Sequence, residues 1–270
     1  MKPRQLILDG DMLVHRSCVA VERDTRFLDR WHILVSNFND AWHILEETLH
    51  DISEIGETDE ILFVFSDPKV NWRKLFEPTY KEDRKATRKP LAYWSVREEI
   101  EKKFPNTVAP TLEADDLMGI LMTTPSDYER VLWSLDKDLK QIPGLHISDD
   151  EVVRISKADG DYFHMYQTVA GDITDGYSGC PGVGGTLAER FLKEGTAFEP
   201  YKHVLKSGKR KGEEELRWKE RPAENMWDTV KTLYEKNGSD EDHAIHQARL
   251  ARILRAEDYV NEEVKLWLPK

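Results

Sequence analysis

Cysteine and long apolar runs are both scarce in this sequence, and each shortage excludes a class of protein. The 270 residues include two cysteines, Cys18 and Cys180, which lie far apart and lack the spacing of metal ligands. A disulfide framework or a zinc site is therefore disfavoured, and we expect two reduced thiols that pack as small apolar side chains. No apolar stretch approaches the roughly 20 residues of a membrane-spanning helix, and the run Leu6–Leu8 is too short for a secretion signal. We expect a cytoplasmic protein that does not bind membranes.

Positive charge is also in short supply. The chain has 39 lysines and arginines against 51 aspartates and glutamates, a net charge of −12, and this balance by itself disfavours a nucleic-acid partner. One stretch is an exception, because residues 69–89 hold eight basic side chains and three acidic ones, a local charge of +5. Phosphate contacts need local positive potential rather than a positive total. This stretch is therefore either a phosphate-binding segment or a solvated basic loop.

Internal repeats and long linkers are absent too, so the sequence favours a single domain over residues 1–270. Its composition, 39% hydrophobic and 10% aromatic, is ordinary for a globular protein. Short apolar runs that alternate with helical patterns predict an α/β fold with a mostly parallel central sheet flanked by helices.

Three of the predicted strands are followed directly by acidic side chains. The strands are Gln5–Leu8, Glu60–Phe65 and Arg130–Leu135, and the acids are Asp9 and Asp11 after the first, Asp67 after the second, and Asp136 and Asp138 after the third. Because ligands of open α/β sheets collect at the carboxyl ends of the strands, we expect these acids to meet at one edge. Asp11 is either an outer ligand of that site or only a turn residue.

Further acids stand at the predicted start of a helix and ahead of a glycine-rich turn. The first group is Glu113, Asp115 and Asp116, and the second is Asp172 and Asp175. Acids at a helix start can simply offset the helix dipole, but clustered carboxylates repel one another unless a cation neutralises them. All-oxygen ligands suit Mg²⁺ or Mn²⁺, and so many acids indicate a two-metal site for an in-line displacement at phosphorus.

The glycine-rich turn follows Asp175 at once. Its glycines are Gly176, Gly179, Gly182, Gly184 and Gly185, and residues 186–193 read as the helix that follows. Glycines allow positive φ and close backbone approach, and exposed N–H groups at a helix N-terminus bind phosphate. The alternative is a surface loop that caps an ordinary helix.

The remaining patterns predict helices over Trp31–Ile52, about 70–77 and about 91–104. Residues 207–215 read as a charged loop, followed by helices over Ala223–Glu235 and Asp242–Leu254. On the last helix Arg249, Arg252 and Arg255 are expected to face mostly outward, as a solvated basic face rather than a DNA contact.

Six motifs occur in order between residue 6 and about residue 192. They are Leu8-Asp9-Gly10, Ser66-Asp67, Tyr80-Lys81-x-x-Arg84, Glu113-Ala114-Asp115-Asp116, Asp136-Lys137-Asp138, and Gly171-Asp172-x-x-Asp175 followed by Gly179-Cys180-Pro181-Gly182-Val183-Gly184. In this order and spacing they resemble the structure-specific 5′ nucleases, the superfamily of flap endonucleases and 5′→3′ exonucleases, and above all its phage and bacterial members. Any one motif is weak, but six in sequence are highly specific.

The resemblance implies a role for each motif. One metal ion is expected at Asp9, Asp67, Glu113 and Asp115, with Asp116 as a further or outer acid, and the second ion at Asp136, Asp138, Asp172 and Asp175. Residues of about 68–107 would form a helical arch, from which Lys81 and Arg84 contact the scissile phosphate. DNA-binding residues would be Arg16, Lys85, Arg88, Lys89, Gly179, Gly182, Gly184 and Gly185.

The resemblance also implies the substrate and the partners. A helix-three-turn-helix over about 172–195 would hold duplex DNA, with K⁺ as a further ligand of that turn, and a helical part would follow over about 223–270. The expected reaction is metal-dependent hydrolysis of phosphodiesters at or near a free 5′ end, flap or nick, in DNA or in the RNA of an RNA–DNA hybrid. A monomer that meets a replication-machinery partner in a bacterial or phage-infected cytoplasm is expected.

Two other classes of protein explain part of the sequence. A haloacid-dehalogenase-type phosphatase also has an Asp-x-Asp after its first strand, which Asp9 and Asp11 would supply, but it gives no reason for the acids at 113–116 or for the glycine turn. A non-catalytic DNA-binding module explains the glycine turn and the basic stretch, but it leaves the carboxylates as unexplained repulsion. Cleavage of flap DNA or of a small phosphomonoester in Mg²⁺ separates the three.

Overall fold

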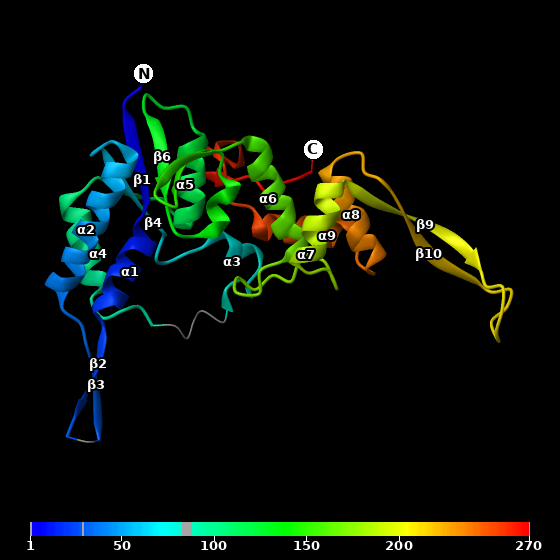
Figure 1. Cartoon of the computed structure of the whole chain (residues 1–270), viewed down its shortest axis with the longest axis horizontal. Coiled ribbons are helices and arrows are strands. Elements are labelled where there is room, and N and C mark those ends of the chain that lie inside the picture. The colour runs from blue at the N-terminus through cyan, green and yellow to red at the C-terminus, as the bar shows by residue number, and fades with distance from the viewer. Residues whose placement is uncertain (1, 29, 83–87, 270) are drawn as a thin grey trace. The chain divides into compact units, whose positions relative to one another are not determined.

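The structure is a computed structural model that describes residues 2–28, 30–82 and 88–269. The chain divides into two compact units (Figure 1). Unit 1 comprises Met1–Pro78, Arg84–Gly160 and Ile253–Lys265, and unit 2 comprises Thr79–Asp83, Asp161–Arg252 and Leu266–Lys270. The sequence favoured one domain, whereas the chain forms two units, each with a hydrophobic core of its own.

Unit 1 is built on a six-stranded sheet in the order β5-β4-β1-β6-β7-β8. The strands are β1 (Arg4–Asp9), β4 (Ile61–Phe65), β5 (Asn106–Val108), β6 (Glu129–Trp133), β7 (Gly144–Ser148) and β8 (Glu151–Ile155). All neighbours are parallel except β8, which runs antiparallel to β7. The prediction of an α/β fold with a mostly parallel sheet is confirmed.

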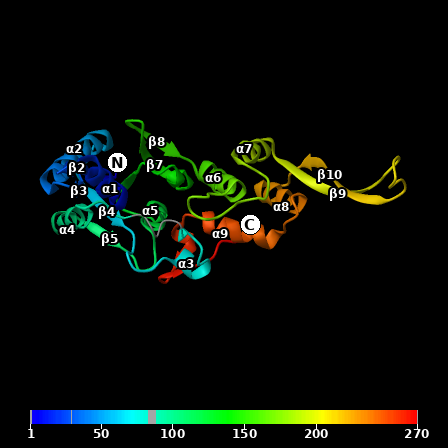
Figure 2. The ribbon, with the colours of Figure 1, turned by 90° about the horizontal axis from the view of Figure 1, so that it is seen from below.

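Helices cover both faces of this sheet, because successive residues of a strand point to opposite faces. Leu6 and Leu8 of β1 pack in the core that also holds buried residues of α1 (Gly10–Val21), α2 (Phe38–Gly56) and α4 (Tyr93–Lys103). Ile7, between them, packs with residues of α5 (Ala114–Thr123) in a second cluster. Figures 1 and 2 show the two layers of helices. A strand buried on both faces explains the continuous apolar run that predicted it.

The predicted helix over Trp31–Ile52 is wrong in its first part. Residues Trp31–Val35 form β3, which pairs antiparallel with β2 (Arg23–Phe27), and α2 begins only at Phe38. The side chain of Asn37 accepts a hydrogen bond from the N–H of Asn39 and so caps the helix. Every residue of the hairpin strands is exposed, so its apolar side chains do not belong to the core that the helical pattern implied.

Unit 2 consists of helices around a smaller core, with a long hairpin. The helices are α6 (Lys157–Ala170, whose first turn belongs to unit 1), α7 (Gly185–Glu194), α8 (Met226–Lys236) and α9 (Glu241–Ala251), and the hairpin pairs β9 (Thr196–Val204) with β10 (Glu214–Pro222). The charged loop expected over 207–215 is therefore the end of a hairpin and the start of β10. The helices expected over 223–235 and 242–254 are confirmed with shifted ends.

Shorter elements connect these parts. They are α3 (Trp72–Phe76), the 3₁₀ helices η2 (Lys137–Gln141) and η3 (Ala256–Asp258), and the two-residue strands β11 (Tyr259–Val260) and β12 (Glu263–Val264). Two arginines that were expected to face outward, Arg252 and Arg255, are only 3% and 2% exposed. The reason is that α9 ends at Ala251, so both residues follow the helix instead of lying on its outer face.

Both cysteines are buried and unpaired, as the sequence predicts for small apolar side chains. Burial raises the pKa of the Cys18 thiol to about 11 and that of Cys180 to about 12. Among the described residues, no helix combines the length and apolar character that crossing a membrane requires.

Candidate functional site

Asp9 lies at the carboxyl end of β1, in the middle of the sheet. Its carboxylate caps α1 by accepting a hydrogen bond from the N–H of Met12 (3.0 Å), and it accepts a second one from the hydroxyl of Ser134 (2.7 Å). The residue is 4% exposed. Burial raises the pKa of Asp9 to about 6, and the neighbouring charges of Asp11 and Asp136 add to the rise. Asp9 is thus a buried acid with other acids beside it.

Ser134 links Asp9 to the acids that follow β6. Its hydroxyl oxygen also accepts a hydrogen bond from the N–H of Asp136 (3.0 Å), and Asp136 accepts one from the N–H of Asp138 (2.9 Å), which caps η2. None of the sequence motifs includes Ser134, although its place two residues before Asp136 is the signal of a Ser turn. The ends of β1 and β6 therefore bring Asp9, Asp136 and Asp138 to one edge of the sheet.

Asp11, two residues after Asp9, binds side-chain and backbone groups of the neighbouring elements. Its carboxylate accepts hydrogen bonds from the N–H of Ser66 (2.9 Å) and from the hydroxyl of Tyr93 (2.5 Å), and it lies 3.6 Å from the guanidinium of Arg97. Burial raises the pKa of Tyr93, and the charge of Asp11 adds to that rise. The carboxylate of Asp11 thus connects α1 to the residue after β4 and to α4. These hydrogen bonds between elements give Asp11 a structural role that goes beyond either an outer metal ligand or a turn residue.

Asp67 follows β4 and fixes the loop that faces it. Its two oxygens accept hydrogen bonds from the N–H groups of Thr111 (2.8 Å) and Lys69 (2.8 Å), and its own N–H donates to the carbonyl of Leu112 (2.9 Å). The bonds from Thr111 and Lys69 lower the pKa of Asp67. The side chain is therefore ionised and is oriented by backbone groups on both sides.

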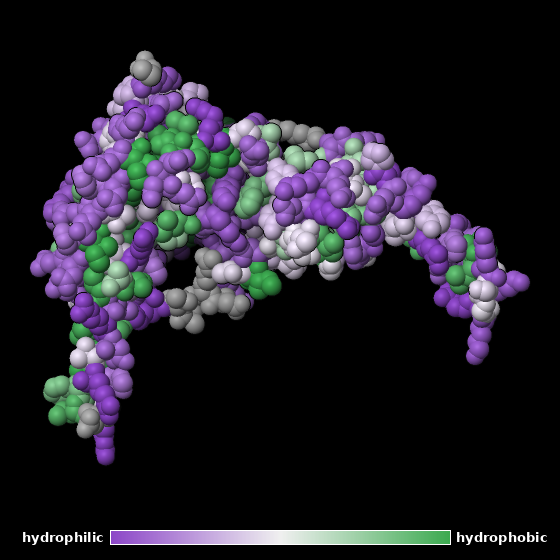
Figure 3. All heavy atoms as spheres, in the orientation of Figure 1, coloured by the Kyte–Doolittle hydropathy of each residue, from purple (hydrophilic) through white to green (hydrophobic). Residues whose placement is uncertain are grey.

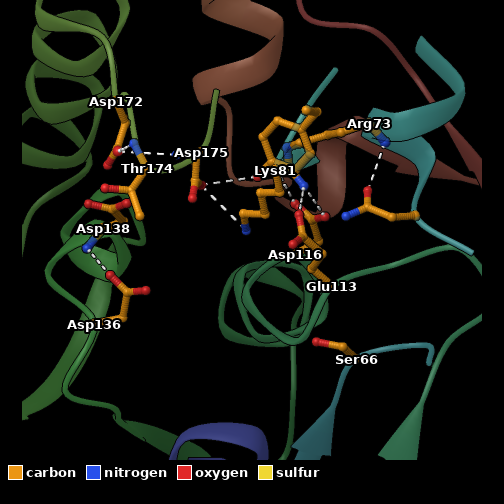
Figure 4. A network of polar contacts seen from close by, with 12 residues as sticks. Ser66, Arg73, Lys81, Glu113, Asp116, Asp136, Asp138, Asp172, Thr174 and Asp175 are labelled. Atoms are coloured by element: carbon orange, nitrogen blue, oxygen red, sulfur yellow. Dashed lines mark hydrogen bonds and ion pairs between the residues drawn. The ribbon is translucent and has the colours of Figure 1, made fainter. Parts of the chain in front are cut away.

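The acids at the start of α5 surround an arginine. Arg73 of α3 donates to Glu113 (2.8 Å) and, through both terminal nitrogens, to Asp116 (2.7 and 2.8 Å), as Figure 4 shows. Asp116 is fully buried and also accepts hydrogen bonds from Trp72 (2.9 Å) and from the N–H of Leu254 (3.1 Å).

Two consequences follow for the predicted residues. Arg73 was counted in the basic stretch, but its side chain is 3% exposed and neutralises acids inside the protein. A direct metal-ligand role for Asp116 would require breaking several of these bonds, so Asp116 fits an outer role better. Asp115, between the two partners of Arg73, is half-buried.

No ready-made metal cage is present among these groups. In the part of the chain that the structure describes, no three His, Cys, Asp or Glu side chains lie close enough together to hold a metal ion. The oxygen-only donors and the like charges around Asp9 nevertheless fit a hard divalent cation, because a cation would offset the burial that chiefly raises the pKa of Asp9 and the neighbouring charges that add to the rise.

Unit 2 contains the second acidic pair together with Lys81. Asp172 accepts hydrogen bonds from the N–H groups of Thr174 (2.8 Å) and Asp175 (3.3 Å). Asp175 accepts one from the hydroxyl of Tyr80 (3.1 Å) and lies 3.4 Å from the ammonium of Lys81 (Figure 4). Lys81 also donates its N–H to the carbonyl of Asp175 (2.9 Å). The lysine expected at the scissile phosphate is thus beside an acid expected at a metal.

The glycine turn is held by a close backbone contact. Gly179 has φ +67°, and a Cβ there would lie 2.4 Å from the N of Gly171, itself at φ +71°. The N–H of Gly179 donates to the side-chain oxygen of Gln247 (2.8 Å). Neither glycine can be replaced without moving backbone.

Gly184 differs from these two. Its φ is −88°, so the expectation that it needs a positive φ is wrong. A Cβ there would meet nothing within 4 Å, and no side chain caps α7, the helix that starts beside it. The helix N-terminus is therefore open at Gly184, whereas at Gly185 a Cβ would lie 2.6 Å from the hydroxyl of Tyr166. Open N–H groups at a helix N-terminus suit an anion. Gly182 has φ +71°.

The other residues expected to bind DNA have varied surroundings. Arg16 is exposed on α1. Arg88 forms an ion pair with Glu22, and the ammonium of Lys89 lies 4.2 Å from the ring centre of Tyr93. Arg84 and Lys85 lie outside the described residues.

Comparison with known proteins gives one family and closely matching relatives. Residues 4–167 match the family model described as "5'-3' exonuclease, N-terminal resolvase-like domain". An exodeoxyribonuclease of Enterobacteria phage T3 is 38% identical, over 98% of this chain and 93% of the relative. An exonuclease of Escherichia phage T7 is 37% identical, with the same coverage.

Solved structures show the same fold at low sequence identity. The T5 5′-exonuclease with bound zinc matches 92% of this chain and 89% of its own length, with a TM-score of 0.60 and 15% identity. The bacteriophage T5 flap endonuclease in a complex with DNA and metal ions matches 71% of this chain and 75% of its own, with a TM-score of 0.51 and 17% identity.

Proposed function

The chain belongs to the 5′–3′ exonuclease family and is a nuclease, and on this premise we propose that it hydrolyses phosphodiesters at or near the 5′ end of duplex or flapped DNA with divalent metal ions. The observation that carries the proposal is the buried carboxylate of Asp9, whose pKa is raised to about 6 with Asp11 and Asp136 beside it. Such a group favours a proton or a cation, and at neutral pH protons are scarce.

The proposed metal ligands follow the family motifs. Asp9, Asp67, Glu113 and Asp115 would hold one ion, and Asp136, Asp138, Asp172 and Asp175 the other. When bound by these carboxylates, Mg²⁺ or Mn²⁺ would supply the activation of a water molecule and the stabilisation of charge on the phosphate and the leaving oxygen. Asp116 stays outside the ligand set because Arg73 and Leu254 already occupy its oxygens.

The chain's own cations have a separate role. Lys81 is 12% exposed and is held beside Asp175, while Tyr80 donates to the same carboxylate. An ammonium in such a protected place stabilises a scissile phosphate more than a fully hydrated one does. Arg84, four residues from Tyr80, would add a second donor. Arg16, Lys85, Arg88 and Lys89 would track the phosphate backbone.

The open N-terminus of α7 would bind duplex backbone. Gly182 and Gly184 leave room for a phosphate, and Gly179 sets the shape of the turn. At Gly185 the hydroxyl of Tyr166 lies 2.6 Å from the position that a Cβ would take, so Gly185 would contribute its backbone N–H rather than open space. In this proposal K⁺ binds to backbone carbonyls of the same turn. The 5′ strand of an RNA–DNA hybrid is also a substrate. The enzyme acts in the cytoplasm of a phage-infected cell, and its partner there is a replication protein.

Product analysis tests the function. The protein is incubated with Mg²⁺ and with matched flap, nicked, blunt and single-stranded DNA that carries a 5′ label, and with an RNA–DNA hybrid. We expect products with 5′-phosphate and 3′-hydroxyl ends, released from the 5′ end, and no cleavage in EDTA. A parallel assay supplies a small phosphomonoester, whose hydrolysis in place of DNA would identify a phosphatase instead.

A double substitution tests the metal assignment. Asp136→Asn with Asp138→Asn should abolish cleavage and leave duplex binding within a few-fold, because these acids hold metal and repel phosphate. The matched control is Asp149→Asn with Asp150→Asn, an exposed pair of adjacent aspartates at the β7–β8 turn, which removes the same number of charges. Near-normal turnover of the first double variant in Mg²⁺ would contradict the two-metal proposal.

A further inference from the structure

The β9–β10 hairpin is a firmly anchored arm. Its two nine-residue strands pair along their whole length, from Thr196 opposite Pro222 to Val204 opposite Glu214. At its base Phe198 is 2% exposed, packs edge-on against Phe191 of α7 with ring centres 5.2 Å apart, and donates its N–H to Thr232 of α8 (3.1 Å). The arm therefore continues directly from α7 and is fixed to two helices of unit 2.

The end of the arm has a defined backbone. The N–H of Leu205 donates to the carbonyl of Glu213 (3.0 Å), and the N–H of Gly212 donates back to Leu205 (2.9 Å). Gly208 and Gly212 have φ of +82° and +90°, which allows the tight return. The residues 205–213, which we name the arm tip, are thus shaped by backbone hydrogen bonds.

The arm tip is basic in an acidic protein. It holds four basic residues and one acid, in a chain whose net charge is −12. Most acids of the arm are paired within it: Glu199 with Lys219 (2.6 Å), Glu214 with Lys202 (2.9 Å), Glu215 with Arg217, and Glu213 with Arg210 (2.5 Å). The exposed ammonium groups of Lys206, Lys209 and Lys211 take part in none of these pairs.

We propose that the arm tip is a second, sequence-independent contact for the phosphate backbone of duplex DNA, made by Lys206, Lys209 and Lys211. This inference rests on the proposed function, because the duplex is the one whose 5′ end is cut. Neutralisation of phosphates releases condensed counterions, and this release needs only exposed positive charge on a stable support.

Charge complementarity favours nucleic acid over a protein partner at this place. The outer half of the arm is mostly hydrophilic (Figure 3), and its exposed apolar side chains are few, chiefly Val204 and Leu216. Protein interfaces are centred on a buried apolar patch with few lysines, which the arm tip does not offer.

The length of the arm sets its reach. Nine residues of strand at about 3.3 Å each extend roughly 30 Å, and one turn of duplex DNA rises by about 34 Å. The open end of α7 and the arm tip lie at opposite ends of the same run of chain. If the turn at Gly184 holds one phosphate, the tip reaches phosphates about one helical turn away, which shorter duplexes lack.

Binding to duplexes of two lengths tests the proposal. The whole protein, in EDTA so that DNA stays intact, is titrated with a duplex of about three turns (~30 base pairs) and with one of about half a turn (~6 base pairs), whose strands are joined by a loop so that they stay paired. The variant K206A/K209A/K211A is compared with K206R/K209R/K211R, which keeps the charge. We expect the alanine variant to bind the long duplex at least about tenfold more weakly, with a salt slope smaller by roughly two to three.

The expected pattern also includes two equalities. The alanine and wild-type proteins should bind the short duplex alike, and the arginine variant should bind the long duplex as the wild type does. If the alanine variant binds the long duplex as tightly as the wild type does, the proposal is overturned. An acidic protein would then be the better candidate for a partner of the arm tip. Equal weakening on both lengths would overturn the assigned reach.

Cleavage separates this inference from the proposed function. All three proteins keep the residues of the active site, so in Mg²⁺ and at saturating protein they should cut the same 5′ ends at similar single-turnover rates. If the wild type cuts DNA and the alanine variant binds normally, only the arm contact fails. If the wild type does not cut DNA, the proposed function fails, whatever the arm binds.

Discussion

At the scale of single residues, the buried charge of Asp9 destabilises the folded protein, whereas the proposed metal site requires that charge. Its carboxylate is buried, and its pKa is raised from 3.8 to about 6, chiefly by burial. The folded protein therefore binds the proton more tightly than the unfolded chain does. The stability that this proton gives is fully present below pH 3.8 and is lost as the pH rises through about 6, which costs on the order of 3 kcal/mol at neutral pH when no cation is bound.

We therefore expect Asp9→Asn to stabilise the metal-free protein while it abolishes cleavage. Without the charge, the free energy of unfolding in urea and EDTA at pH 7.5 should rise by up to about 3 kcal/mol, and at pH 4 the variant and the wild type should differ little. The exposed Asp51→Asn on α2 is the control and should change neither. A less stable Asn variant at pH 7.5 would show that hydrogen bonding, not desolvation, dominates at this position.

Lys81 and Lys89 separate a working arch from a solvated basic loop. Lys81→Ala should lower single-turnover cleavage at saturating enzyme by at least about a hundredfold, because it removes a protected donor to the scissile phosphate. The ammonium of Lys89 lies over the ring of Tyr93, and Lys89 is proposed to contact the phosphate backbone rather than the scissile phosphate. Lys89→Ala should therefore weaken DNA binding in low salt and leave the single-turnover rate unchanged. Similar, modest effects of both substitutions on rate and binding would remove the arch from the mechanism.

At the scale of elements, the glycine turn contains a matched pair of positions. Gly179→Ala places a Cβ against backbone atoms at 2.4 and 2.5 Å and at a positive φ, so it should destabilise the protein by several kcal/mol. Gly184→Ala meets nothing in the protein, so it should cost at most about 1 kcal/mol as a poorer helix cap.

Substitutions at Gly179 and at Gly184 should separate folding from DNA binding. Thermal unfolding measures the loss of stability, and titration with nicked duplex at moderate salt measures the loss of affinity. We expect Gly184→Val, with its larger side chain, to fold and to bind duplex more weakly than Gly184→Ala. Wild-type affinity of the folded Gly184→Val variant would mean that the open end of α7 does not hold the backbone.

The elements that the sequence predicted well are those with a single strong signal. The strands β1, β4 and β6 are continuous apolar runs that end in acids, and both features follow from burial on two faces. The helical prediction is wrong at Trp31–Val35 because these apolar residues fit both a spacing of three to four and a spacing of two, while Asn37 is the residue whose side chain signals the true start of the helix. β9 and β10 gave no apolar signal, since cross-strand ion pairs, not burial, occupy much of their length beyond Phe198.

The candidate site was predictable as a set of acids but not as a network. The motifs indicated Asp9, Asp67 and Asp136, because the type of each residue and its order along the chain can be read directly from the sequence. The sequence could not show that Arg73 would be buried between Glu113 and Asp116, or that Ser134 would join Asp9 to Asp136. Those roles depend on contacts between segments about 40 to 125 residues apart.

At the scale of the whole molecule, unit 1 is made of segments that are distant in the chain. The N–H groups of Ile253 and Leu254 donate to Gln141 (3.1 Å) and Asp116 (3.1 Å), and that of Ala256 donates to Thr123 (2.8 Å). The segment Ile253–Lys265 therefore closes the side of the unit on which α5 lies.

This closure makes Arg73 a stability residue of the whole unit. Arg73→Met should leave Asp116 buried without its charge partner, and loss of one partner of a buried ion pair costs about 3–5 kcal/mol. Urea unfolding should show the loss, while the exposed neighbour Lys74→Met should be neutral. Arg73→Met combined with Asp116→Leu should recover part of it, and a full loss in the double variant would assign the effect to packing of Arg73 on Trp72 instead.

The split composition of unit 1 also has a consequence during protein synthesis. A ribosome that adds about 5–20 residues per second needs roughly 5–20 s to make the residues between Gly160 and Ile253. Throughout that time the acids of unit 1 are present, but the backbone partner that Leu254 provides for Asp116 is not. Unit 1 can therefore complete its hydrogen bonds only after most of unit 2 has been translated, and we expect a chain that stops before Ile253 to leave Asp116 without this partner and to be less stable for that reason.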